Sequence, residues 1–157
     1  MIQVYDDRYF MKLALDEGMK AMQAGEIPIG GVLVSNHQLL ARAHNQTELL
    51  QDITAHAEIL CVTAASQFLQ SKYLKECTLY VTLEPCPMCA GALRWAQLGR
   101  LVYAAEDLKM GYMRYGSGML HPKTKVEYGL MEEESSRLLK DFFAIRREIQ
   151  SMKKKSF

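Results

Sequence analysis

Residues 78–98, with the sequence TLYVTLEPCPMCAGALRWAQL, predict a short strand that passes directly into a helix. The β-branched and aromatic residues at 78–83 favour a strand. A proline fits the first turn of the helix that follows, and Gly99 is well suited to end that helix. Cys86 and Cys89 therefore lie near a helix start, where two sulfur atoms in a Cys-x-x-Cys arrangement can reach one metal ion.

The segments on either side alternate between helices and strands. Residues 29–35 and 39–44 predict a hairpin with a tight turn at Asn36-His37. Strands that alternate with helices indicate an α/β fold built in layers. The expected helices span 7–24, 55–68, 85–98 and about 131–153, and the expected strands span 29–35, 39–44, 78–83, 101–104 and 125–128.

The gross composition indicates one ordinary globular domain. The chain has 157 residues, of which 49% are hydrophobic, so residues 1–157 can build a single core that includes the C-terminal helix. The net charge of +1 means that nucleic-acid binding would need a local basic patch. No signal peptide and no apolar run of roughly 20 residues is visible, which predicts a soluble, cytoplasmic protein without a membrane partner. Its cysteines would then be reduced.

A histidine upstream completes a candidate metal site. His56 supplies a third ligand beside Cys86 and Cys89, and zinc favours this set of imidazole and thiolate donors. Cys61 lies about 140° around the same expected helix from His56, and Cys77 opens a strand at the far end from the Cys-x-x-Cys pair. Both are expected to be buried thiols. The fourth position is thereby left to water, whose pKa a bound zinc ion lowers to roughly 7.

Glu58 gives this site a candidate proton carrier. It lies in the first turn of the helix that follows His56, from which its carboxylate can turn toward the metal-bound water. A Cys-x-x-Cys pair alone is often a structural zinc knuckle or a redox pair, and His-Ala-Glu alone carries little information. In this order, however, the two motifs match the signature of zinc deaminases. The residues thus predict a hydrolytic deaminase that replaces an exocyclic amine on a nucleic-acid base with oxygen.

Over nearly its whole length the chain resembles the bacterial tRNA-specific adenosine deaminases, which belong to the zinc-dependent cytidine/deoxycytidylate deaminase superfamily. The resemblance implies a three-layer cytidine-deaminase-like fold with a five-stranded mixed sheet flanked by helices. It also implies a homodimer with one Zn²⁺ per subunit that converts adenosine to inosine at the wobble position of the tRNA anticodon loop. The segments that carry it are 25–30, 41–45, 55–58, 82–92, 141–143 and 146–147, together with Asp107, Lys109 and Gly111.

The same resemblance assigns roles to individual residues. Zinc would be bound by His56, Cys86 and Cys89, and Glu58 would shuttle protons. The implied substrate-binding residues are Asn45, Pro28, Ile29, Ala57 and Asp107, and the implied RNA contacts on the C-terminal helix are Phe142, Phe143, Arg146 and Arg147.

Two rival functions remain open on the sequence. A guanine, cytosine or cytidine deaminase that acts on a free base or nucleoside would share the zinc site, and Trp95 is reminiscent of guanine deaminases. The segment 110–123 is shorter than usual and carries aromatic residues where smaller ones are common. The second rival function is that of a non-catalytic, zinc-stabilised RNA-binding module. From helical spacing alone, Trp95 and Phe142 are both expected to be packing residues.

Overall fold

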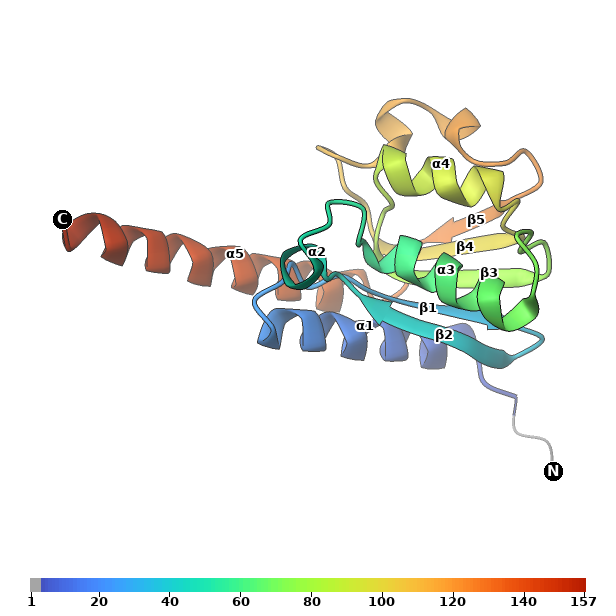
Figure 1. Ribbon diagram of the computed structural model, residues 1–157, viewed down its shortest axis with the longest axis horizontal. Helices are drawn as coiled ribbons and strands as arrows, with labels where there is room; N and C mark the ends of the chain where they lie inside the picture. Colours follow the sequence, from blue (N-terminus) through green and yellow to red (C-terminus); the bar gives the residue numbers. More distant parts are fainter. Residues whose placement is uncertain (1–3) are drawn as a thin grey trace.

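One five-stranded sheet organises the protein in the computed structural model, which describes residues 4–157 (Figure 1). The strand order is β2-β1-β3-β4-β5. Strand β1 is antiparallel to β2 and to β3, whereas β4 and β5 run parallel to β3, so the sheet is mixed as expected. The strands are β1 (Gly30–Ser35), β2 (Gln38–His44), β3 (Cys77–Leu83), β4 (Arg100–Ala105) and β5 (Lys125–Tyr128).

Helices cover both faces of this sheet. Helices α3 and α4 lie on one face, and α1 and α5 lie on the other, which gives the three layers predicted from the sequence (Figure 1). The absence of a signal peptide was inferred partly from residues 1–3, which lie outside the described residues. The helices are α1 (Asp7–Gln23), α2 (Thr47–Leu50), α3 (Ala57–Leu69), α4 (Pro87–Trp95) and α5 (Glu132–Lys155), with 3₁₀ turns η1 (Tyr112–Arg114) and η2 (Ser117–Met119).

The alternation of side chains along the strands divides the core into two clusters. On β1, Leu33 packs into the cluster below α3 and α4, whereas Val32 and Val34 pack into the cluster against α1. Strand β4 behaves in the same way, with Leu101 on one side and Val102 on the other. This period of two is what a strand buried on both faces requires.

Helix α1 approaches the sheet closely at one glycine. A Cβ atom added to Gly30 would lie 2.1 Å from the carbonyl oxygen of Ala14 and 2.4 Å from the backbone nitrogen of Gly18. Any side chain at position 30 would therefore push α1 away from the start of β1. The residues just before β1 include Pro28 and Ile29, so this contact also fixes the backbone that enters the candidate site.

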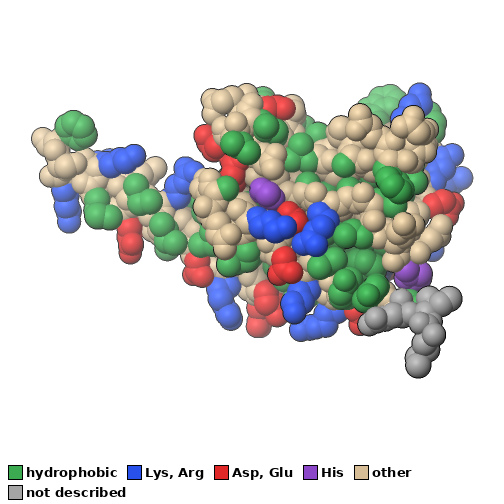
Figure 2. Space-filling model, turned by 60° about the horizontal axis from the view of Figure 1, so that its bottom comes forward, with side chains coloured by type: hydrophobic (Ala, Val, Ile, Leu, Met, Phe, Trp, Pro, Cys, Tyr) green, Lys and Arg blue, Asp and Glu red, His purple; other side chains and the backbone are tan. Residues whose placement is uncertain are grey.

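A buried carboxylate joins α1 to β2. Oε1 of Glu17 accepts hydrogen bonds from Lys20 Nζ at 2.9 Å and Arg42 Nε at 2.9 Å, and Oε2 lies 3.0 Å from His44 Nδ1. Figure 2 shows charged side chains of both signs around a histidine in the middle of this face. Because His44 is followed directly by Asn45, the network holds the chain where it leaves β2 for the site.

Helix α4 differs from its predicted form. It begins at Pro87, with the proline in the first turn, and ends at Trp95 rather than at Leu98. Leu93 and Ala96 point into the core, and Trp95 lies on the outer side with 83% of its surface exposed. The expectation that Trp95 packs in the core is therefore wrong.

Helix α5 is part of the core only in its first half. Phe142 is 6% exposed, which confirms that it packs in the core, but Ile145 and Ile149 are nearly half exposed. The second half of the helix projects past the sheet at the end where α3 and α4 begin (Figure 1). None of the helices in residues 4–157 combines the length and the apolar character that crossing a membrane requires.

Candidate active site and metal centre

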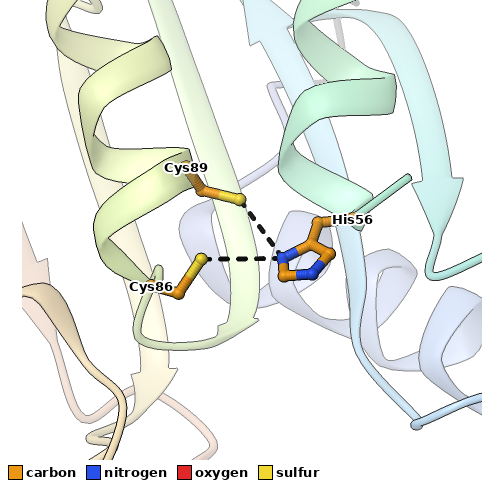
Figure 3. Close-up of side chains that lie close together, drawn as sticks. All are labelled: His56, Cys86 and Cys89. Atoms are coloured by element: carbon orange, nitrogen blue, oxygen red, sulfur yellow. Dashed lines mark hydrogen bonds between the residues drawn. The ribbon is translucent and has the colours of Figure 1, made fainter. Parts of the chain in front are cut away.

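The first turns of α3 and α4 meet at one end of the sheet and bring the three predicted metal ligands together (Figure 3). His56 immediately precedes α3, Cys86 immediately precedes α4, and Cys89 lies in the first turn of α4. Strands β2 and β3 both finish at this end of the sheet, because each is antiparallel to β1. The chain can therefore start two helices side by side after leaving these strands.

The spacing of the three donor atoms suits a tetrahedral metal ion. His56 Nδ1 lies 3.6 Å from Cys86 Sγ and 3.4 Å from Cys89 Sγ, and all three ligand atoms lie within 4.8 Å of one another. Zinc bonds of about 2.3 Å to sulfur and about 2.0 Å to nitrogen, at a tetrahedral angle, place those two atoms about 3.5 Å apart. The donor set and its dimensions thus fit zinc with three protein ligands.

Electrostatics at the cluster favour a thiolate. Hydrogen bonds from Cys89 and from His56 lower the pKa of Cys86 to about 4, against the opposing effect of its burial. The hydrogen bond with Cys86 in turn raises the pKa of His56. A cysteine at a helix start also gains from the partial positive charge of the exposed backbone amides. The site therefore holds a soft anionic donor at neutral pH.

Glu58 lies buried in the first turn of α3, within the same region of the protein. Burial raises the pKa of its carboxyl group to about 7. A carboxyl group with such a pKa exchanges its proton readily at neutral pH, which is the property that general acid–base chemistry requires. The two other cysteines, Cys61 and Cys77, are buried away from the cluster, as expected.

Asn45 ties the substrate-binding candidates together. Its Oδ1 accepts a hydrogen bond from the backbone nitrogen of Ala57 at 3.0 Å, and its backbone nitrogen donates to the carbonyl of Ile29 at 3.1 Å. Asn45, Ala57 and Pro28 are buried, and Ile29, which follows Pro28 in the chain, is partly exposed. The structure therefore brings four of the five predicted substrate residues to the start of α3.

Asp107 lies apart, in the loop that follows β4. Its Oδ1 accepts hydrogen bonds from the backbone nitrogens of Lys109 and Met110, at 3.1 and 3.0 Å. Its own backbone nitrogen donates to Glu84, two residues before Cys86. The loop thus connects to the metal-binding segment through Glu84, and the Asp107 carboxylate shapes the loop itself.

The four predicted RNA contacts on α5 divide into buried and exposed residues. The ring of Phe142 is covered by the Arg146 guanidinium, whose central carbon lies 5.1 Å from the ring centre. Arg146 Nη2 donates to the carbonyl of Gly25 at 3.0 Å and so joins α5 to the segment that leads to Pro28. Phe142 is a core residue, and Phe143, Arg146 and Arg147 are the members of the set that solvent reaches.

Two buried carboxylates near the site, Glu26 and Glu84, lie in segments 25–30 and 82–92, and the sequence assigned neither of them a role. Glu26 accepts hydrogen bonds from the backbone nitrogens of Glu48 and Leu49, at 2.8 and 3.4 Å, and so holds the short helix α2. Glu84 accepts from Asp107 and Met113. In the sequence, each glutamate lies one or two residues before a proline. That pattern does not predict that its side chain binds the backbone of a distant loop.

Comparison with known proteins places the chain in a deaminase family. Residues 5–147 match the MafB19-like deaminase family. The chain is 41% identical to the tRNA-specific adenosine deaminase of Aquifex aeolicus, over 86% of this chain and 92% of that protein. It is 42% identical to the tRNA-specific adenosine deaminase of Bacillus subtilis, over 94% and 93%. A chloroplastic tRNA(adenine(34)) deaminase of Arabidopsis thaliana is 39% identical, but the chain spans only 12% of its length.

Solved structures give the same placement. A structure from work on A-to-I editing by tRNA deaminases at the wobble position of transfer RNA superimposes with a TM-score of 0.79. That protein is 42% identical, over 83% of this chain and 99% of its own. A guanine deaminase from Bacillus subtilis is 36% identical with a TM-score of 0.63, over 65% of this chain and 66% of its own. The chain belongs to the deaminase family, and its nearly full-length relatives make it a member of the tRNA-specific adenosine deaminases.

Proposed function

We propose that this protein hydrolyses the 6-amino group of adenosine at the wobble position of a tRNA anticodon loop, so that adenosine and water give inosine and ammonia. The observation that carries the proposal is the group of three metal-ligand atoms with a buried glutamate beside it. The full-length similarity to tRNA-specific adenosine deaminases supports the choice of substrate.

His56, Cys86 and Cys89 would hold one Zn²⁺ per subunit through Nδ1 and the two Sγ atoms, since their separations fit the bond lengths of zinc. When bound there, zinc supplies Lewis acidity and makes water a better nucleophile at neutral pH. Three protein ligands leave one coordination position for the reaction, whereas a structural zinc site has four protein ligands.

Glu58 moves the protons of the reaction. Its carboxylate takes a proton from the attacking water and delivers it to N1 of the purine, which makes C6 more electrophilic. The same carboxyl group then protonates the amine that leaves C6. Burial raises the pKa of this carboxyl group above its ordinary value, which makes its protonated form more accessible near neutral pH than that of an exposed glutamate.

The base would lie at the start of α3. An adenine that is stacked within a loop cannot present C6 to a buried group, so the target nucleotide must be flipped out of the loop. Pro28, Ile29 and Ala57 give this region an apolar wall, and Asn45 offers an amide for hydrogen bonding to the nucleotide. Asp107 would contact the RNA from the neighbouring loop.

The C-terminal helix would provide contacts to the RNA backbone. Phe143 is exposed for stacking, and Arg146 and Arg147 are exposed for phosphate contacts on the part of α5 that contacts Gly25. Lys153, Lys154 and Lys155 extend this basic character to the end of the helix. Phosphate contacts of this kind weaken as salt concentration rises.

We also propose that the chain is one deaminase domain that includes α5 and works in the cytoplasm as a homodimer. Exposed aromatic side chains gather where α3 and α4 end, at Phe68, Tyr73 and Trp95, and Tyr73 and Trp95 line one hollow there. Large exposed apolar patches mark association surfaces. Light scattering should give twice the mass of the 157-residue chain, and Trp95→Glu should return the mass of one chain.

The second candidate activity is deamination of free guanine, which the partial likeness to the guanine deaminase of Bacillus subtilis favours.

Measuring ammonia release by the zinc-loaded protein distinguishes the two activities. The first substrate is an anticodon stem-loop that carries adenosine at the wobble position. Free adenosine, guanine and cytosine are offered in parallel, and Glu58→Gln is the control. Inosine formed in the stem-loop alone supports the tRNA activity. Release from guanine, with an untouched stem-loop, replaces it with a free-base activity, and zinc binding without any ammonia release leaves an RNA-binding module.

A further inference from the structure

Glu84 lies between the last residue of β3 and the metal-binding segment, and only 5% of its surface is exposed. Its two carboxylate oxygens accept hydrogen bonds from the same loop. Oε1 accepts from the backbone nitrogen of Asp107 at 3.4 Å, and Oε2 accepts from that of Met113 at 3.2 Å. One side chain thus holds both ends of residues 107–113.

The fit at Gly111 shows how closely the loop lies against this carboxylate. A Cβ atom added to Gly111 would lie 1.6 Å from Oε2 of Glu84 and 2.5 Å from the carbonyl oxygen of Asp107. The next residue continues the contact, since the backbone nitrogen of Tyr112 donates to the carbonyl of Pro85 at 2.9 Å. The loop therefore rests on residues 84–85, which lead directly into Cys86.

The loop folds its backbone around Asp107 and leaves two apolar side chains exposed, whereas Tyr112 at its end packs in the core. The Asp107 carboxylate and carbonyl accept from the backbone nitrogens of Lys109, Met110 and Gly111. Leu108 and Met110 are 83% and 64% exposed. Ordering the backbone of each residue costs about 1–2 kcal/mol of conformational entropy, so a loop ordered before binding spares the complex that cost.

We propose that Glu84 is a positioning residue for RNA binding, and that through it residues 107–113 form a rigid platform on which Leu108 and Met110 pack against a base of the substrate. The proposal rests on the proposed function, because an RNA loop opened around a flipped-out adenosine exposes the faces of neighbouring bases. Apolar side chains that lie next to the metal-binding segment suit those faces. Glu84 itself touches no substrate.

Two substitutions break the same contact from opposite sides. Glu84→Gln keeps the size of the side chain but turns one acceptor oxygen into a donor, which cannot accept from Asp107 or Met113. Gly111→Ala places a methyl group against Oε2 and leaves every charge unchanged. The matched controls are Glu106→Gln, an exposed carboxylate in the same loop, and Gly118→Ala, whose Cβ would meet no atom within 4 Å.

The first measurement follows the loop without using activity. We expect trypsin to cleave after Lys109 faster in both variants, and the amides of residues 107–113 to lose protection from hydrogen exchange, while zinc content and the exchange of β3 stay as in the unaltered protein. Both controls should behave as the unaltered protein. Unchanged cleavage and exchange in Glu84→Gln would show that Glu84 does not hold residues 107–113 in place, whatever the substrate of the enzyme is.

The second measurement separates binding from chemistry. With the anticodon stem-loop, KM should rise roughly tenfold in both variants, which is the effect of losing about 1.4 kcal/mol of binding energy, while kcat changes by no more than about threefold. Leu108→Ala should raise KM without faster cleavage at Lys109. A fall in kcat and in zinc content at unchanged KM would overturn the proposal, because Glu84 would then support the metal ligands. If the unaltered protein forms no inosine, both the proposed function and the RNA contact at Leu108 and Met110 are refuted. The cleavage experiment then still tests whether Glu84 holds residues 107–113.

Discussion

The buried carboxylate of Glu17 offers a sharp test of what holds α1 to β2. Burial alone would raise its pKa, but the hydrogen bonds from Lys20, His44 and Arg42 outweigh burial, so that the pKa of Glu17 lies below its ordinary value. Glu17→Gln keeps the shape of the side chain and removes its charge. We expect this variant to be folded but less stable than the unaltered protein.

The size of the loss follows from the exposure of the three donors. A hydrogen bond to a charged group contributes about 1.5–3 kcal/mol when it is shielded from water, and an exposed ion pair contributes less than about 1 kcal/mol. The side chains of Lys20, Arg42 and His44 are 55%, 35% and 19% exposed. Lys20 therefore adds little, and Arg42 and His44 provide most of the stabilisation. We expect Glu17→Gln to lower the free energy of unfolding by about 2–3 kcal/mol.

Urea unfolding of the zinc-saturated protein at pH 7.5 measures this loss, with Asp16→Asn as the control. Asp16 is the neighbouring residue on α1 but is exposed, so its replacement should cost less than about 0.5 kcal/mol. Because the pKa of Glu17 is lowered by folding, its contribution is complete above the unfolded value of 4.5 and is lost as pH falls below it. The gap should therefore narrow when the measurement is repeated below pH 4.5. A Glu17→Gln variant as stable as Asp16→Asn would refute the reasoning.

Three further outcomes test the site and the packing. Glu58→Gln should lower kcat at least 10²-fold while zinc content measured by elemental analysis stays the same, and retained turnover would exclude Glu58 as the proton carrier. Phe142→Ala should lower the free energy of unfolding in urea by about 3 kcal/mol, whereas Phe143→Ala should change it by less than about 1 kcal/mol and weaken only RNA binding. Gly30→Ala should lower the free energy of unfolding in urea by about 1–3 kcal/mol, because its methyl group meets the backbone of α1. Gly91→Ala, whose methyl group would have open space around it, should not lower it by a comparable amount.

Local sequence signals predicted the strands within one or two residues at each end. Alternation of side chains and turn residues decide a strand locally, as at Asn36 and His37, whose positive φ angles suit the tight hairpin. The order and spacing of His56, Cys86 and Cys89 likewise predicted their convergence, because each lies at a helix start. The exposure of Trp95 was beyond such signals, since it depends on α4 ending three residues before the expected position.

The contacts that support the site join residues far apart in the chain. Asn45 and Ala57 are separated by 12 positions, and Glu84 and Met113 by 29. Such a pair is decided by the way two loops pack on a finished sheet, so neither residue carries a pattern that names its partner. The sequence therefore indicated the chemistry of the site and left its supports to be found in the structure.

The position of the three metal ligands has a consequence for folding. His56 and Cys86 lie 30 positions apart, and the chain between them contains α3 and β3. An ion bound to both closes this stretch into a ring, and a cross-link over a loop of that length removes about 3–4 kcal/mol of entropy from the unfolded chain. The ring encloses the central strand of the sheet but excludes α1 and α5. Bound metal should therefore cross-link the middle of the polypeptide. When the metal is removed, α3 and α4 should unfold before α1 and α5 on the opposite face of the sheet.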